Sequence, residues 1–291
     1  MIIIQLFGLV KMEKIFIRAD PVTKELSNGI YSLKYSQEYG VYISLVEEKT
    51  DKPLDILEES YKVIKKDFDK FISLEEKYKE NGFEFNRAIL LYGEPNCGKK
   101  YISRKISEGF DGITIYFEDP VEVLKIVSLI KMNDVNKKIL LISDDIALMS
   151  EKYGVIAVTN LFKSRDNSDG IYIICTTNYE DKISEYLSDR PGIFEEKFFV
   201  DYPNKLDREK YIKFIFSKFE IKVTSKKILK ITNDTDGLSL GHIKNLIESS
   251  FFFDYDYEDK LEELKVMKEN IQLTLYPENS ADSGKGIGFG N

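Results

Sequence analysis

Several residue types are absent or scarce in this chain, and the shortages exclude several classes of protein. Its 291 residues contain no tryptophan, one histidine, two cysteines and seven prolines. Cys97 and Cys175 show no paired spacing, so the sequence provides no disulfide framework and we expect a reducing, cytoplasmic location. Seventeen glycines and seven prolines are too few for a collagen-like or linker-like chain.

Long apolar runs are also missing. No segment approaches the ~20 apolar residues of a membrane-spanning helix, so we expect a soluble protein with no membrane partner. Residues 1–10 are apolar, but they lack a basic start and a small-residue cleavage site, which makes a signal peptide a poor fit.

Basic residues are outnumbered, and arginine is rare. The chain has 42 Lys and Arg against 50 Asp and Glu, a net charge of −8. This balance argues against a globally basic surface for nucleic acid and leaves only a local patch open. Rigid bidentate contacts to phosphate require arginine, so each arginine is a candidate phosphate-binding residue. The arginines are Arg18, Arg87, Arg104, Arg165, Arg190 and Arg208.

The chain does contain enough apolar surface for a folded core, with 43% apolar residues. Residues 1–50 indicate a β-rich region, in which strands at 30–35 and 41–46 flank a turn ending at Gly40. Helical spacing follows over 53–80. After Gly82, short apolar runs alternate with helix-like segments, which is typical of parallel βα units. The runs are 88–92, 113–117, 139–142, 171–175 and 198–200; the segments are 98–109, 121–132, 147–164 and 180–187.

These patterns predict an α/β fold, with a parallel sheet sandwiched by helices and a small helical domain after it. We assign residues 51–202 to the αβα core, 203–272 to the helical domain and 273–291 to a flexible tail. Helices are expected at 205–219, 225–232, 239–253 and 254–270.

A candidate phosphate loop follows the run at 88–92. Gly93 and Gly98 allow a tight turn whose backbone amides converge on an anion, and Lys99 would reach the β- and γ-phosphates. The next position, where a Ser or Thr hydroxyl normally ligates nucleotide-bound Mg²⁺, is Lys100. Two interpretations stay open. Either Lys100 turns into solvent and the Mg²⁺ site is weakened, or its ammonium occupies the position of the metal.

Polar residues end two further strands. Asp144 and Asp145 follow 139–142, where the first would organise Mg²⁺ and the second would polarise the attacking water. Asn178 follows 171–175 and can hydrogen-bond the γ-phosphate and that water. Arg190, just before Pro191, is placed to project into a neighbouring subunit; the simpler interpretation is a surface ion pair with Asp189 or Glu195.

Taken in this order, the motifs between about residues 83 and 250 resemble the AAA+ ATPase family, in its AAA branch. The resemblance implies a P-loop NTPase core with a helical lid domain, an ATP or ADP ligand, and a homo-oligomeric ring or partial ring. By the resemblance, Asp144-Asp145 is the Walker B pair, Asn178 the first sensor and Arg190 the arginine finger. The implied nucleotide-binding residues are Gly93, Glu94, Pro95, Asn96, Cys97, Gly98, Lys99, Lys100, Tyr101, Gly241 and His242, the last two near the base.

This sequence departs from the family pattern at several positions. Asp145 stands where Glu is usual, Ile193 stands where a second Arg is usual, and the helix after residue 239 contains no Arg. No aromatic pore loop follows 113–117, which argues against polypeptide threading. Two functions remain open: an ATPase that couples hydrolysis to remodelling or assembly of a protein partner, and a hydrolysis-impaired structural or regulatory subunit. Clamp-loading and helicase-loading relatives keep a nucleic-acid role open, although the acidic balance argues against it.

Overall fold

The computed structural model describes residues 3–5, 14–18, 26–37, 40–46, 55–178 and 192–275, and at 3–5, 14–18, 166–167 and 270–275 the description is of the backbone alone. The chain forms two compact units. The first contains Met1–Pro53, Leu57–Glu94 and Gly98–Asp201, and the second contains Leu54–Ile56, Pro95–Cys97 and Tyr202–Asn291.

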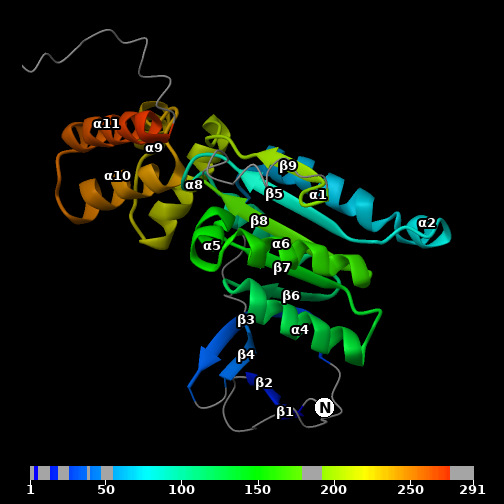
Figure 1. Cartoon of the computed structure of the whole chain (residues 1–291). Helices are drawn as coiled ribbons and strands as arrows, with labels where there is room; N and C mark the ends of the chain where they lie inside the picture. The colour runs from blue at the N-terminus through cyan, green and yellow to red at the C-terminus, as the bar shows by residue number, and fades with distance from the viewer. Residues whose placement is uncertain are drawn as a thin grey trace, which may run out of the picture. The chain divides into compact units, whose positions relative to one another are not determined.

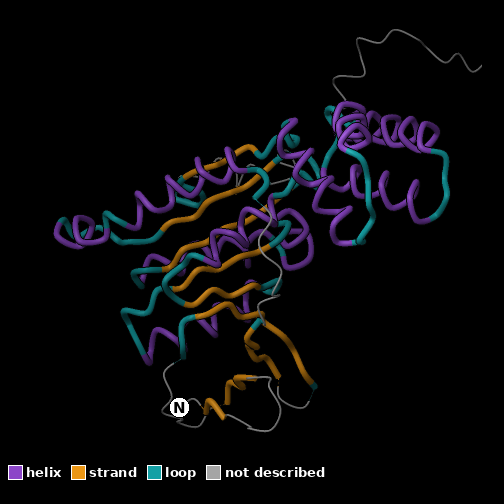
Figure 2. Tube along the Cα trace, turned by 180° about the vertical axis from the view of Figure 1, so that it is seen from behind, coloured by secondary structure: helices purple, strands orange, loops and turns teal. Residues whose placement is uncertain are grey.

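The first unit is built on one sheet (Figures 1 and 2), in which the described residues form nine strands in the order β1-β2-β4-β3-β6-β7-β8-β5-β9. The strands from β3 to β9 in that order run parallel, and β1, β2 and β4 extend the sheet with antiparallel pairings. Their bounds are β1 Ile3–Gln5, β2 Lys14–Arg18, β3 Gly29–Ser36, β4 Gly40–Leu45, β5 Arg87–Tyr92, β6 Ile113–Tyr116, β7 Ile139–Ser143, β8 Ile171–Thr177 and β9 Glu196–Phe199.

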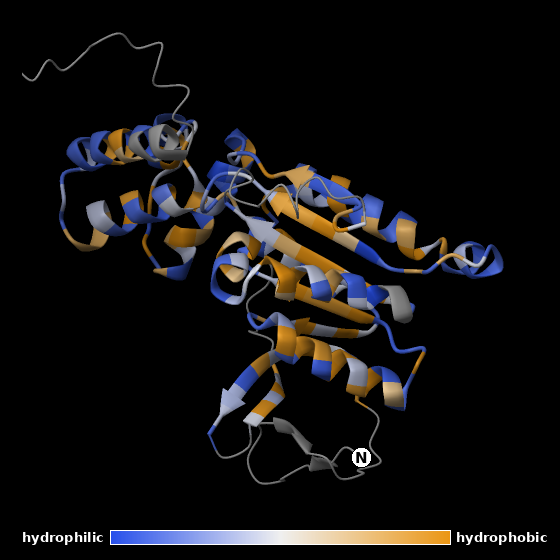
Figure 3. Ribbon diagram, viewed as in Figure 1, coloured by the Kyte–Doolittle hydropathy of each residue, from blue (hydrophilic) through white to orange (hydrophobic). Residues whose placement is uncertain are grey.

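The central strands are buried along their whole length, and Figure 3 shows them as the apolar band of this unit. Every residue of β7 and β8 is buried, because helices cover both faces of a parallel sheet. The α/β prediction is therefore confirmed. All five apolar runs after residue 82 form strands, β5 to β9.

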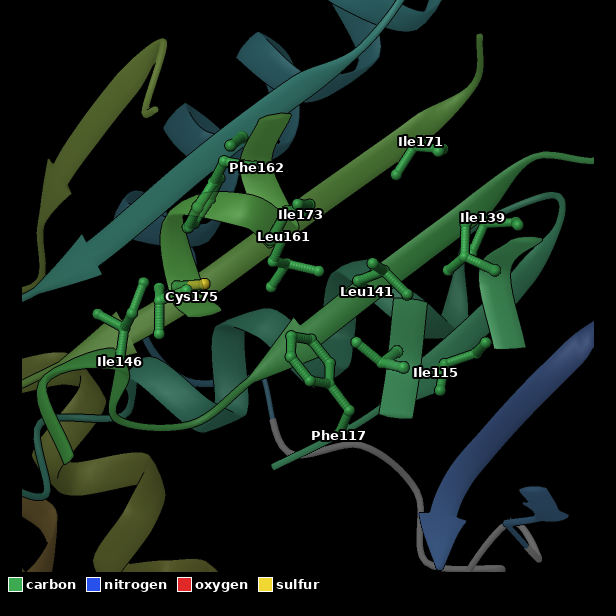
Figure 4. Packing of buried hydrophobic residues seen from close by; sticks show 14 of the residues in the cluster. Ile115, Phe117, Ile139, Leu141, Ile146, Leu161, Phe162, Ile171, Ile173 and Cys175 are labelled. Carbon is green, nitrogen blue, oxygen red and sulfur yellow. The ribbon is translucent and has the colours of Figure 1, made fainter. Parts of the chain in front are cut away.

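Alternate residues of β8 pack on opposite faces of the sheet. On one face, Tyr172 contacts Phe68 and Phe71 of α1, with ring centroids 5.7 and 6.2 Å apart. On the other, Ile173 and Cys175 join a core cluster (Figure 4). Its helical members include Ile146, Leu161 and Phe162. The helices of this unit are α1 Glu58–Ile72, α2 Glu75–Glu80, α3 Lys99–Glu108, α4 Pro120–Asn133, α5 Ile146–Tyr153, α6 Val155–Lys163 and the 3₁₀ turn η1 Ser164–Asn167.

Two expected helices are each interrupted. The helical spacing over 53–80 gives α1 and α2, separated by Ser73 and Leu74. The segment 147–164 gives α5 and α6, because Gly154 adopts φ 83° and ψ 148°, which no helix accommodates. The segment expected at 180–187 lies outside the described residues.

The predicted hairpin is confirmed, since β3 pairs antiparallel with β4 around the turn that ends at Gly40. Its connection to the rest of the molecule was not predicted. Gly29 to Ser32 of β3 pair in parallel with Ile113 to Tyr116 of β6, so the hairpin continues the main sheet. This pairing covers the β6 edge, whose backbone groups would otherwise need another partner.

The second unit contains the four helices expected after residue 204: α8 Lys205–Lys218, α9 Ser225–Asp234, α10 Leu240–Phe252 and α11 Tyr257–Leu275. The side chains of Asn204, Thr224 and Ser239 accept backbone amides at the starts of α8, α9 and α10. Ile212, Ile231, Leu246 and Leu264 belong to their common core. Among the described residues of both units, no helix has the length and apolar character needed to cross a bilayer.

Candidate functional site

The candidate phosphate loop joins the end of β5 at Tyr92 to the start of α3 at Lys99. Gly93, Asn96 and Gly98 have positive φ values of 136°, 60° and 103°, which fold the six residues between strand and helix into a tight turn. Gly93 is also required by close packing. A Cβ at this position would lie 2.5 Å from the carbonyl oxygen of Val200, just after β9.

Lys99 lies inside this turn. Its side chain is buried, and Nζ donates hydrogen bonds to the carbonyl oxygens of Gly93 at 2.6 Å and Glu94 at 2.7 Å. Gly98 caps α3 without a side chain, so the first amides of the helix receive no side-chain acceptor from the cap residue. A buried ammonium and a helix N-terminus therefore face the same turn, an arrangement suited to an anionic ligand.

The other residues of the loop differ in exposure. Glu94 and Cys97 are buried, whereas the side chain of Asn96 is exposed. Pro95 is half-buried, and so is Tyr101, the third residue of α3.

Pro95 to Cys97 belong to the second compact unit, in which Asn96 approaches α10. A Cβ placed on Gly241 would lie 2.8 Å from the Cβ of Asn96, so only glycine fits at this point. The structure thus brings Gly241 beside Asn96 of the loop.

His242 is the next residue of α10 and is half-buried. Its Nδ1 lies 2.9 Å from the Oγ of Ser239, the helix N-cap. Burial, with a smaller contribution from the positive charge of Lys268, lowers the pKa of His242 below its ordinary value. The ring is therefore held neutral near pH ~7.

Lys100 and Asp144 form an ion pair. Lys100 is the second residue of α3 and Asp144 directly follows β7, and Nζ lies 3.0 Å from Oδ2. The Lys100 side chain is 74% exposed and that of Asp144 is 37% exposed. The exposed side chain of Lys100 agrees with the first interpretation, in which the lysine turns into solvent. The contact of its ammonium with Asp144, the acid expected to organise the metal, agrees with the second.

Asp145 has a local structural partner. It adopts φ 56° and caps α5, with Oδ1 accepting the amide of Leu148 at 3.3 Å. Its own amide donates to Oγ1 of Thr176 at 3.2 Å, near the end of β8. The backbone of Asp145 is thus tied to the neighbouring strand.

Asn178 follows β8 and is half-buried. Because Tyr92 pairs with Thr177 and Ser143 pairs with Cys175, the phosphate loop, Asp144 and Asn178 all leave the carboxyl edge of the sheet on adjacent strands. Ligands of open parallel sheets bind at this edge. Arg190 lies outside the described residues.

The described residues do not fit the Mg²⁺ ion expected from the resemblance. A lysine has three donors and no acceptor, so Lys100 cannot ligate a cation. Its ammonium is instead paired with Asp144. Among the described residues, no group of three or more His, Cys, Asp and Glu side chains could hold a metal ion.

Arg165 has a structural role that no pattern in the sequence predicted. This arginine is buried in η1 and donates to the carbonyl oxygens of Phe162 and Gly192, at 3.0 and 2.8 Å. Its Nη1 also pairs with Oε2 of Glu195 at 3.1 Å. Arg165 therefore anchors the backbone just after the Arg190-Pro191 pair. The scarcity of arginine was the only signal for it in the sequence.

Comparison with known proteins gives distant relatives, and no protein-family model matches. The chain is 24% identical over 188 residues to the peroxisomal ATPase pex1 of Schizosaccharomyces pombe, and the alignment covers 58% of this chain and 20% of that protein. It is 24% identical over 202 residues to the ATP-dependent zinc metalloprotease FtsH of Aquifex aeolicus, with 60% of this chain and 31% of the relative. FtsH of Ureaplasma parvum is 22% identical over 199 residues, with 62% of this chain and 27% of that protein. The chain thus spans less than a third of the length of each of these curated relatives.

Proposed function

We propose that this chain, which is related to the AAA+ ATPases, binds the phosphates of ATP or ADP in the loop of residues 93–99. The observation that carries the proposal is the placement of Lys99. Its buried ammonium is held by two carbonyl oxygens of the loop itself, Gly93 and Glu94. A phosphate entering the turn would meet that charge together with the N-terminal amides of α3.

In the first form of the proposal, hydrolysis is coupled to remodelling or assembly of a protein partner by a homo-oligomeric ring or partial ring. Asn178, which directly follows β8, the strand paired with β5, would bind the γ-phosphate and the attacking water. Arg190 would act on the nucleotide of the neighbouring subunit, where such a finger is worth ~10³–10⁵ in rate.

A second form is favoured by one observation, the Lys100–Asp144 ion pair. In this form the chain holds nucleotide as a structural or regulatory subunit and hydrolyses it poorly. Asp145 contributes to the same expectation, because its carboxylate caps α5 and is one methylene shorter than the usual Glu. A misplacement of about 1 Å at such a position can cost ~10² in rate.

Phosphate release per chain, measured at increasing protein concentration, separates the two forms. An ATPase with a finger acting between subunits gains specific activity on assembly, and Arg190→Ala abolishes the gain. The matched control is Arg104→Ala, because Arg104 pairs with Glu108 on its own helix. Specific activity of the natural protein and of Arg190→Ala that stays at background at every concentration would favour the nucleotide-holding form.

The double substitution Lys100→Thr with Asp145→Glu tests whether these two positions limit turnover. We expect it to raise the rate of phosphate release by about ten- to a hundredfold. An unchanged rate would place the limitation at other residues.

A further inference from the structure

We propose that this chain binds its nucleotide without requiring Mg²⁺, because the ammonium of Lys100 supplies positive charge where the metal ion would otherwise lie. The inference rests on the proposed nucleotide site and adds its cation requirement. Its starting observation is the 3.0 Å contact between Lys100 Nζ and Asp144 Oδ2.

The position of Lys100 is set by well-anchored elements on both sides. Its neighbour Lys99 is buried in the loop, which fixes the first turn of α3. Asp144 follows β7, a strand buried along its whole length at the centre of the sheet. The ammonium therefore lies at the carboxyl edge of the sheet, beside Asp144, and both residues of the pair are attached to well-packed elements.

The ion pair is easily exchanged for another anion. An exposed lysine–carboxylate pair contributes little to stability, and the Lys100 side chain is 74% exposed. A phosphate that enters the loop carries more negative charge than the carboxylate, so the ammonium can turn from Asp144 to a phosphate oxygen at small cost. Lysine is well suited to this task, because it is a compact point charge on a flexible stem.

The same pair opposes binding of a divalent cation. Before nucleotide enters, the expected acidic ligand carries a cation on Oδ2. Once the ammonium has turned to a phosphate oxygen, its charge repels a divalent cation that approaches the same phosphate. The hydroxyl that would complete the metal site is absent, since Lys100 takes that position. The carboxylate of Asp145 accepts a hydrogen bond from the Leu148 amide, so this oxygen is already used within the protein. Lys99 and Lys100 together supply two positive charges next to the phosphates.

The experiment is isothermal titration of the 291-residue chain with ATP, in excess MgCl₂ and in excess EDTA. For the natural protein we expect the two dissociation constants to agree within about threefold. For Lys100→Thr, which restores a hydroxyl and removes the charge, we expect affinity at least about tenfold weaker in EDTA than in MgCl₂. Thermal melts check that each variant is folded.

Lys125→Thr is the matched control, because Lys125 is 62% exposed and pairs with Glu122 on α4, away from the loop. It should keep the cation independence of the natural protein. Affinity for ATP that falls tenfold or more in EDTA for the natural protein would overturn the inference while leaving the proposed site intact. Equal affinities in both buffers for Lys100→Thr would also overturn it. No binding of ATP by the natural protein in either buffer would instead overturn the proposed function, and this inference with it.

Discussion

At the scale of single residues, the candidate site is defined by backbone positions as much as by charged side chains. Gly93 has φ 136° and lies against the carbonyl of Val200, and Gly241 lies against the side chain of Asn96. Both glycines were predicted as binding residues from the sequence. Their close contacts could not be predicted, because each involves a residue more than a hundred positions away in the chain.

Gly93→Ala tests the close contact at the start of the loop. The new methyl group would lie 2.5 Å from the Val200 carbonyl oxygen, so the substitution carries an overlap in addition to the strain of a positive φ. Gly154→Ala is the control, because Gly154 has φ 83° and a Cβ there would meet no atom within 4 Å. We expect Gly93→Ala to lower the free energy of urea unfolding by about 2 kcal/mol more than Gly154→Ala does. Equal losses would show that the loop relaxes around the methyl group.

His242 predicts a dependence of stability on pH. Burial lowers its pKa in the folded chain, so the unfolded chain binds the proton more readily. The stabilising contribution of the neutral ring is complete above the ordinary pKa of ~6.5 and is lost as the pH falls through the lowered, folded-state value.

The corresponding measurement compares His242→Gln with the natural protein. Between about pH 7.5 and about pH 5, the natural protein should lose more free energy of unfolding than the variant, whose residue 242 does not titrate. The carboxylates common to both proteins cancel in the difference. A parallel decline in the two proteins would contradict the assignment.

At the scale of elements, local patterns predicted the strands well and the helix interruptions poorly. The apolar runs that became β7 and β8 are buried on both faces, so they are continuous in the sequence. Gly154 separates α5 from α6 even though the apolar periodicity continues across it. A single glycine inside a helical pattern is often tolerated, which is why the sequence alone did not predict the break.

Arg165 of η1 holds the segment that leads into β9, through Gly192 and Glu195. Substitution by Met removes the buried guanidinium that donates to the Gly192 carbonyl and pairs with Glu195, whose side chain is 34% exposed. We expect Arg165→Met to lower the free energy of unfolding by about 2 kcal/mol, because several hydrogen bonds from a buried donor are lost.

The control for Arg165 is Arg104→Met, which removes an exposed pair with Glu108 and should cost less than about 1 kcal/mol. Both values come from chemical denaturation. Limited proteolysis should also cut Arg165→Met earlier within residues 192–195, the segment that Arg165 holds. Similar losses in both variants would contradict the anchoring role.

At the scale of the whole molecule, the sequence predicted the order of strands and helices but not the long-range pairings. The parallel contact between β3 and β6 joins segments about 80 residues apart in the chain, and no local pattern encodes such a partner. The candidate site was likewise predictable only in part. Lys99, Asp144 and Asn178 each come after a strand that the apolar runs of the sequence predict. The capping contact of Asp145 and the Lys100–Asp144 distance depend on how α3 and α5 are placed.

Isothermal titration calorimetry of the 291-residue chain and of Lys99→Met, with ATP and with ADP, tests directly whether Lys99 binds the phosphates of a nucleotide. Met keeps the length of the buried side chain and removes its charge. We expect the natural protein to bind both nucleotides and Lys99→Met to lose about a hundredfold or more in affinity, because a buried phosphate-binding charge is removed. Failure of the natural protein to bind either nucleotide, or equal binding by a folded Lys99→Met, would contradict the proposed site.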